Sequence, residues 1–228
     1  MKKLMTVLVV TMVASLFFAL VFVIPAYADA SADGLNPKIL AYAINGYRWA
    51  VKHNDVQNPA MLTIVDFNRP SNRSRLWVID LKTDRVLMHT HVAQGKNTGK
   101  LYAKYFSNRP GSNESSLGVY TTADVYDGEH GESLRVRGLE NGINSNAYSR
   151  AIVIHPAWYV APSFIKQNGY AGRSWGCFAL NPARADQLIS LVKGGSVLFA
   201  YASPEKYDAR VDHSLSERGQ AIYNAILS

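Results

Sequence analysis

Residues 76–92 read LWVIDLKTDRVLMHTHV, and this stretch decides the fold class of the chain. It contains two runs rich in apolar and β-branched residues, 76–81 and 85–92, separated by the polar turn Lys82-Thr83-Asp84. Two such runs joined by a short polar break are typical of an antiparallel β-hairpin. The sequence therefore predicts that this part of the chain is built on a β-sheet.

Other segments extend this prediction in both directions. Four further runs have strand character, at 118–122, 134–137, 151–154 and 197–201. Apolar residues recur at helical spacing elsewhere, and Asn36-Pro37 and Asn181-Pro182 each look like an N-cap followed by proline in the first turn. The expected helices cover 37–52, 162–168, 182–193 and 214–227. The predicted fold class is therefore mainly β with accessory helices.

The N-terminus has the three parts of a secretory signal peptide. Residues 1–3 are basic, 4–24 form an uncharged apolar run, and 26–28 read Ala-Tyr-Ala, a cleavage site. The apolar run is also long enough to be an uncleaved membrane anchor, but the Ala-x-Ala end favours cleavage. The expected division is a signal peptide (1–28), an N-terminal helical extension (29–65), a main domain (66–203) and a C-terminal helical tail (204–228).

The charge of the chain restricts its partners only weakly. The formal net charge is +7 at pH 7, and removal of the two signal-peptide lysines would lower it to +5. A basic excess suits an anionic polymer such as bacterial cell wall, although it could serve solubility alone. Nucleic acid is disfavoured by export and by the lack of a basic cluster with interleaved aromatics. No phosphate-binding Gly-rich loop and no His-Glu-x-x-His zinc pattern occurs, so neither a cofactor nor a metal is expected.

Cys177 is the only cysteine, within Arg173-Ser174-Trp175-Gly176-Cys177-Phe178. An exported protein with one cysteine cannot close an internal disulfide, so the thiol needs another explanation. A lone cysteine can be an inert, buried, small hydrophobe. Here Ser174 and Gly176, with Gly169 and Gly172 nearby, indicate a tight, exposed turn, which favours a nucleophile.

His155 is the best candidate base for this thiol. A thiol attacks well only as thiolate, and His155 follows the apolar run 151–154, 22 residues before Cys177. The amides of Gly176 and Cys177 could form an oxyanion hole, and a third group, such as a backbone carbonyl, should orient the imidazole. Together these residues predict acyl transfer through a thioester.

Other polar residues have two interpretations each. His89 and His91 share one face of a strand and could hold a metal, but no third ligand is evident and packing is favoured. His130 is expected in a loop and could line a cleft. Arg173 could hold a substrate carboxylate or be a solvated loop charge, and Trp175 could form a wall of the cleft or be a packing residue.

These residues carry a resemblance to a known family. His155 followed by Ser174-Trp175-Gly176-Cys177 resembles the histidine and Ser-x-Gly-Cys signature of the cysteine-dependent murein L,D-transpeptidases. The resemblance covers about residues 60–202. Further segments that resemble one bacterial branch of that family are 74–81, 92–95, 106–108, 115–118 and 150–155.

The resemblance implies a β-sandwich-like catalytic domain at 66–203, acting on peptidoglycan stem peptides. It implies that Cys177 attacks the carbonyl of the third stem residue and expels the terminal D-Ala, with His155 as general base and acid. An amine of a neighbouring stem would then resolve the thioester to a 3→3 cross-link. The carbonyl of Pro156 would orient the histidine. Expected substrate contacts are Ser174, Arg173 and Trp175, with Gly176 in the catalytic turn.

The chain departs from the family pattern at three positions. Trp175 replaces a second histidine of the common form, Ala179 replaces an asparagine, and Gln94 stands where the branch has a histidine. These departures leave alternatives open: an L,D-carboxypeptidase that uses water, or a wall-binding module with weak or lost catalysis. Another cysteine hydrolase is disfavoured, because papain-like peptidases usually place the cysteine before the histidine. The expected location is the periplasm or cell envelope.

Overall fold

A computed structural model describes residues 34–53, 56–203 and 217–227. The predicted signal peptide and residues 204–216 lie outside this range. The strands are β1 (Met61–Asp66), β2 (Leu76–Asp80), β3 (Arg85–Thr90), β4 (Gln94–Gly95), β5 (Gly118–Gly128), β6 (Gly131–Gly138), β7 (Val153–Pro156), β8 (Arg173–Ser174), β9 (Phe178–Leu180) and β10 (Val197–Tyr201). The helices are α1 (Pro37–His53), α2 (Pro162–Asn168), α3 (Pro182–Val192) and α4 (Glu217–Leu227), with short 3-10 turns η1 (Lys96–Thr98) and η2 (Trp158–Val160).

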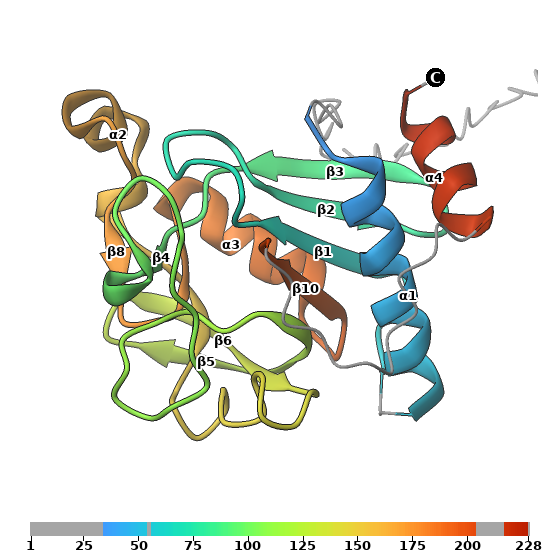
Figure 1. Ribbon diagram of the computed structural model, residues 1–228, viewed down its shortest axis with the longest axis horizontal. Helices are drawn as coiled ribbons and strands as arrows, with labels where there is room; N and C mark the ends of the chain where they lie inside the picture. The colour runs from blue at the N-terminus through green and yellow to red at the C-terminus, as the bar shows by residue number, and fades with distance from the viewer. Residues whose placement is uncertain (1–33, 54–55, 204–216, 228) are drawn as a thin grey trace, which may run out of the picture.

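One eight-stranded sheet dominates the fold, in the order β3-β2-β1-β10-β5-β6-β7-β9. The pairs β1–β10 and β7–β9 are parallel, and the other neighbours are antiparallel. The sheet curls into a half-barrel, while β4 and β8 form a small separate sheet beside α2 (Figure 1). The prediction of a mainly β domain with accessory helices is therefore confirmed.

The hairpin at 76–92 forms as predicted. Strands β2 and β3 pair antiparallel, with Trp77 opposite His89. In the turn, the Lys82 amide and the Thr83 hydroxyl donate to the Asp80 carboxylate at 2.8 and 2.9 Å. Asp84 has a φ of 53°, a left-handed conformation that aspartate tolerates better than most residues. Hydrogen bonds within the turn thus favour the antiparallel pairing of β2 and β3.

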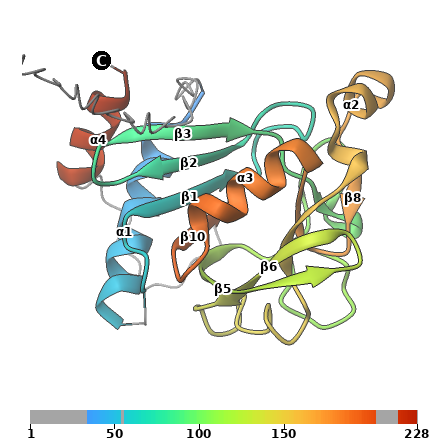
Figure 2. The ribbon, with the colours of Figure 1, turned by 180° about the vertical axis from the view of Figure 1, so that it is seen from behind.

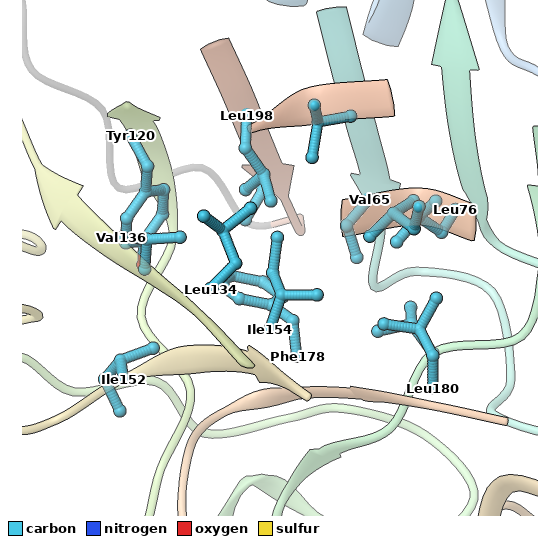
Figure 3. Close-up of a cluster of buried hydrophobic side chains, with 14 of the residues drawn as sticks. Val65, Leu76, Tyr120, Leu134, Val136, Ile152, Ile154, Phe178, Leu180 and Leu198 are labelled. Atoms are coloured by element: carbon cyan, nitrogen blue, oxygen red, sulfur yellow. The ribbon is translucent and has the colours of Figure 1, made fainter. Parts of the chain in front are cut away.

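Strands in the middle of the sheet bury both faces. In β10, Leu198 and Ala200 belong to an inner core, and Phe199 and Tyr201 to an outer one. Successive side chains of a strand point to opposite faces, so both faces are covered. Helix α3 packs inside the curl, and α1 and α4 pack outside, as the view from behind shows (Figure 2). Figure 3 shows inner-core side chains from several strands converging, Leu134, Ile154 and Phe178 among them.

No strand is predicted for residues 61–66, yet β1 lies in the middle of the sheet, between β2 and β10. Its burial on both faces removes the polar–apolar alternation that marks a half-exposed strand. The expected boundary between the extension (29–65) and the main domain (66–203) falls within β1, while α1 packs on the same sheet. The division into domains stays a prediction.

The predicted helices are present with small changes of their ends. Helix α1 ends one residue later than expected, and α2 matches the prediction. Asn181 caps α3 as expected, because its side-chain oxygen accepts from the Ala183 amide at 3.2 Å. Within the three described ranges, no helix is long and apolar enough to cross a membrane.

Candidate active site

Two neighbouring strands bring the predicted nucleophile and base together. Strands β7 and β9 run parallel, with Ile154 opposite Phe178 and His155 opposite Ala179. Cys177 directly precedes β9 and therefore lies at the end of the strand that flanks His155. Parallel neighbours need a crossover connection, and here α2 and β8 lie within it.

The strand that carries the histidine begins later than predicted. The prediction was 151–154, with His155 after its end, but β7 spans Val153–Pro156 and contains His155. Ala151 has a φ of 53°, and the Ile152 amide donates to the Ala147 carbonyl at 2.9 Å. These two residues therefore finish a turn before the strand starts.

Most of the predicted site residues line one cavity of about 450 Å³. Its walls come from the β5–β6 hairpin, β7, η2 and the turn between β8 and β9. The predicted residues among them are Cys177, His155, Ser174, Arg173 and Trp175. Gly176 does not line it and packs behind the turn, close to Glu114 and Ile152.

His155 is buried and held in one orientation. Its side chain is 5% exposed, and its Nδ1 lies 2.9 Å from the carbonyl oxygen of Pro156. A carbonyl can only accept, so Nδ1 carries the hydrogen and Nε2 is left to accept a proton. Burial lowers the pKa of His155, a contact with the Pro156 carbonyl raises it, and His130 lowers it. The net effect is to lower the pKa, so the imidazole of His155 is neutral at pH 7.

Cys177 is a partly buried, free thiol. Its sulfur donates to the Ala151 carbonyl at 3.6 Å. Burial raises the pKa of Cys177, whereas the backbone of Val153 and the charge of Arg150 lower it to a smaller degree. The thiol is thus protonated at rest and requires a base to become a nucleophile.

Ser174 organises the turn that presents the thiol. Its hydroxyl donates to the Cys177 carbonyl at 2.8 Å and accepts from the Gly176 amide at 3.1 Å. Gly176 has a φ of 123°, and a Cβ there would lie 2.8 Å from the Glu114 carbonyl oxygen. Only glycine fits this position without strain. The Gly176 amide, expected in an oxyanion hole, donates to Ser174 in this structure, and its role in an oxyanion hole stays a prediction.

Arg150 is a residue of the site that the motifs did not single out. Its guanidinium, half-buried beside the Cys177 turn, ties the loop 107–116 to this region and lowers the pKa of Cys177. Backbone carbonyls and serines are its partners, and such partners leave no pattern in a sequence. The acceptors are the carbonyls of Ser107 (2.7 Å) and Glu114 (2.6 Å) and the hydroxyls of Ser116 (2.7 Å) and Ser112 (3.2 Å).

Gln94 supports β8, the strand that leads into the Cys177 turn. Its side-chain oxygen accepts from Arg75 at 2.7 Å, and Arg75 is fully buried with two further bonds to the Val92 carbonyl at 3.0 and 2.8 Å. Burial lowers the pKa of Arg75 to about 9. The backbone of Gln94 pairs with Arg173 of β8, so this buried network supports the strand that leads into the Cys177 turn.

The structure decides between the two interpretations of Trp175 and places Arg173 and His89. Trp175 is 76% exposed and lines the cavity, so its interpretation as a packing residue is wrong. Arg173 is exposed, lines the cavity and donates to the Lys96 carbonyl at 3.2 Å. The ring of His89 stacks on Trp77 at 4.6 Å, in keeping with the packing interpretation. Across the described parts of the chain, no group of three or more His, Cys, Asp or Glu side chains could hold a metal.

His130 lies at the tip of the β5–β6 hairpin, and its ring stacks on His155 with centroids 5.0 Å apart. It is exposed and lines the same cavity, which confirms the cleft-lining interpretation. The sequence offers no signal for the stacking, because 25 residues separate the two histidines.

A model of the L,D-transpeptidase catalytic domain family matches residues 31–201, well over half of the chain. The chain belongs to this family. A search of curated proteins found no match.

Solved structures with similar folds are also known. An L,D-transpeptidase from Mycobacterium smegmatis has 16% identity and a TM-score of 0.40, with 63% of this chain and 59% of that one covered. The cell shape determining protein Pgp2 (K307A mutant) from Campylobacter jejuni has 10% identity and a TM-score of 0.44, with 84% and 62% covered. The chain thus spans about three fifths of their length, and identities this low carry no argument about function.

Proposed function

We propose that this protein is an exported peptidoglycan L,D-transpeptidase that forms 3→3 stem-peptide cross-links through a thioester on Cys177. The observation that carries the proposal is the pairing, in one cavity of a chain from this family, of the only cysteine with a buried, oriented histidine. The cell-envelope location rests on the signal-like residues 1–28.

The reaction has two half-reactions. His155 Nε2 takes the thiol proton, the sulfur attacks the carbonyl of the third stem residue, and His155 returns the proton to the departing D-Ala amine. An amine of a second stem then attacks the thioester and releases the thiol. Exposed Trp175 and Arg173 at the cavity edge are in position to contact the stem, Trp175 by its ring and Arg173 by charge.

Mass spectrometry of protein and products tests the proposal. The protein and its Cys177→Ala variant are incubated with disaccharide-tetrapeptide. A Cys177 adduct equal to the donor minus D-Ala, together with a cross-linked dimer, supports transpeptidation. An adduct that yields only tripeptide makes the protein a carboxypeptidase. Folded protein without an adduct refutes the enzymatic proposal and favours a wall-binding module.

A further inference from the structure

Two cavities meet beside His155. The smaller one, of about 450 Å³, contains Cys177 and His155. The larger one, of about 680 Å³, has neither of them in its wall. His130 and Tyr159 line both cavities and therefore form the boundary between them.

The position of His130 places an imidazole between the two spaces. Its ring stacks on that of His155 at 5.0 Å with 30° between the planes, so it covers one face of the buried imidazole. His130 itself is exposed, which lets a proton on it exchange with water. A molecule in the larger cavity therefore reaches the imidazole of His130 and not that of His155.

The walls of the larger cavity suit a cationic group. Among the described residues that line it, Glu132 and Asp186 carry carboxylates, and no lysine or arginine is present. Trp158 adds an indole that is 71% exposed and is braced by edge contacts with Tyr159 and Phe164 at 5.8 and 5.5 Å. Carboxylates and the face of an indole both attract ammonium groups.

An amine that arrives as ammonium must lose protons before and during its attack on a thioester. On the basis of the proposed function, we propose that the larger cavity admits the amine acceptor and that His130 accepts the proton from its attacking nitrogen. The two histidines then divide the reaction: His155 serves the formation of the thioester, and His130 serves its resolution.

The atoms balance in this step. The amine nitrogen forms a bond to the thioester carbonyl carbon, and the bond from that carbon to the sulfur of Cys177 breaks. The ammonium first loses one proton to water, the attacking nitrogen gives a second proton to His130, which releases it to water, and the departing thiolate takes one proton from water to become the thiol again. The other titratable or charged groups that line the smaller cavity are Tyr126, Glu129, Tyr159 and Arg173.

Separate rates for the two half-reactions test this division. The His130→Phe variant keeps an aromatic ring over His155 and cannot accept a proton. Asp127→Asn, an exposed change in the same hairpin, is the matched control. Each protein is mixed with tetrapeptide donor, and the Cys177 adduct is followed by mass spectrometry before and after addition of the acceptor stem.

We expect His130→Phe to form the adduct at a rate within about twofold of the unchanged protein, and to lose it to the acceptor about a hundredfold more slowly. The adduct should accumulate. Equal slowing of both steps would overturn the proposal and leave His130 as a positioning residue for His155. An unchanged acceptor step would also overturn it. If the unchanged protein forms no adduct, the proposed function itself fails.

Discussion

Replacement of Arg150 by methionine should loosen the turn that carries Cys177 and destabilise the domain. Methionine keeps much of the side-chain volume but donates no hydrogen bond. Arg150 has four acceptors, all at 3.2 Å or less and all in the loop 107–116. Glu114 in turn lies against Gly176, so the loss should reach the turn that carries Cys177.

The magnitude follows from these four bonds. A hydrogen bond from a charged donor contributes about 1.5–3 kcal/mol when buried. Arg150 is only half-buried, and its acceptors can regain water, so about 1 kcal/mol for each bond is appropriate. The total of about 3–4 kcal/mol is below a typical stability of about 5–15 kcal/mol. Arg150→Met should therefore fold, with a melting temperature lower by about 10 °C.

Thermal unfolding measured by circular dichroism checks the stability, and the pH dependence of iodoacetamide alkylation reports the thiol. Since the charge of Arg150 lowers the pKa of Cys177, its removal should move alkylation to higher pH. Arg150→Lys should retain part of the stability, and the exposed Arg184→Met is the control. A melting temperature within about 2 °C of the Arg184→Met value, or an unchanged alkylation profile, would refute this reasoning.

Three further outcomes are expected. Gly176→Ala should lower the rate of adduct formation by more than about tenfold, because the new Cβ would approach the Glu114 carbonyl oxygen at a φ of 123°. Turnover of the tetrapeptide measures this effect, and a near-normal rate would contradict the geometry. In the unchanged protein, burial raises the pKa of Cys177, so its thiolate fraction at pH 8 should be below that of a free cysteine. The rate of alkylation, compared with that of a model thiol, tests the direction of this pKa shift. A faster rate than that of the model thiol at pH 8 would contradict the prediction. Gln94→Leu should lower the free energy of unfolding in urea by about 2 kcal/mol, because it leaves buried Arg75 without its side-chain acceptor. Gln94→Glu keeps an acceptor at this position and is the comparison. Equal stability of the two variants would show that this hydrogen bond contributes little.

Much of the architecture is predictable from local sequence. The hairpin at 76–92 depends on two apolar runs and a polar turn whose side chains hydrogen-bond within the turn. Helix α3 follows from the Asn181-Pro182 cap and an apolar stripe. Strand β1 was missed because its partners, β2 and β10, bury both of its faces and remove the alternation. A strand in the middle of a sheet depends on neighbours that are distant in the chain.

By itself, the sequence determined which residue types the candidate site contains: one cysteine in a glycine-containing turn, a histidine after an apolar run, and a serine and a glycine between them. Only the tertiary structure decided which groups surround that chemistry. It set Arg150 beside the turn, stacked His130 on His155, and directed the Gly176 amide to Ser174. The physical reason is that the sequence lists the reactive side chains, whereas their burial, their pKa values and their hydrogen-bond partners depend on contacts between distant segments that only folding brings together.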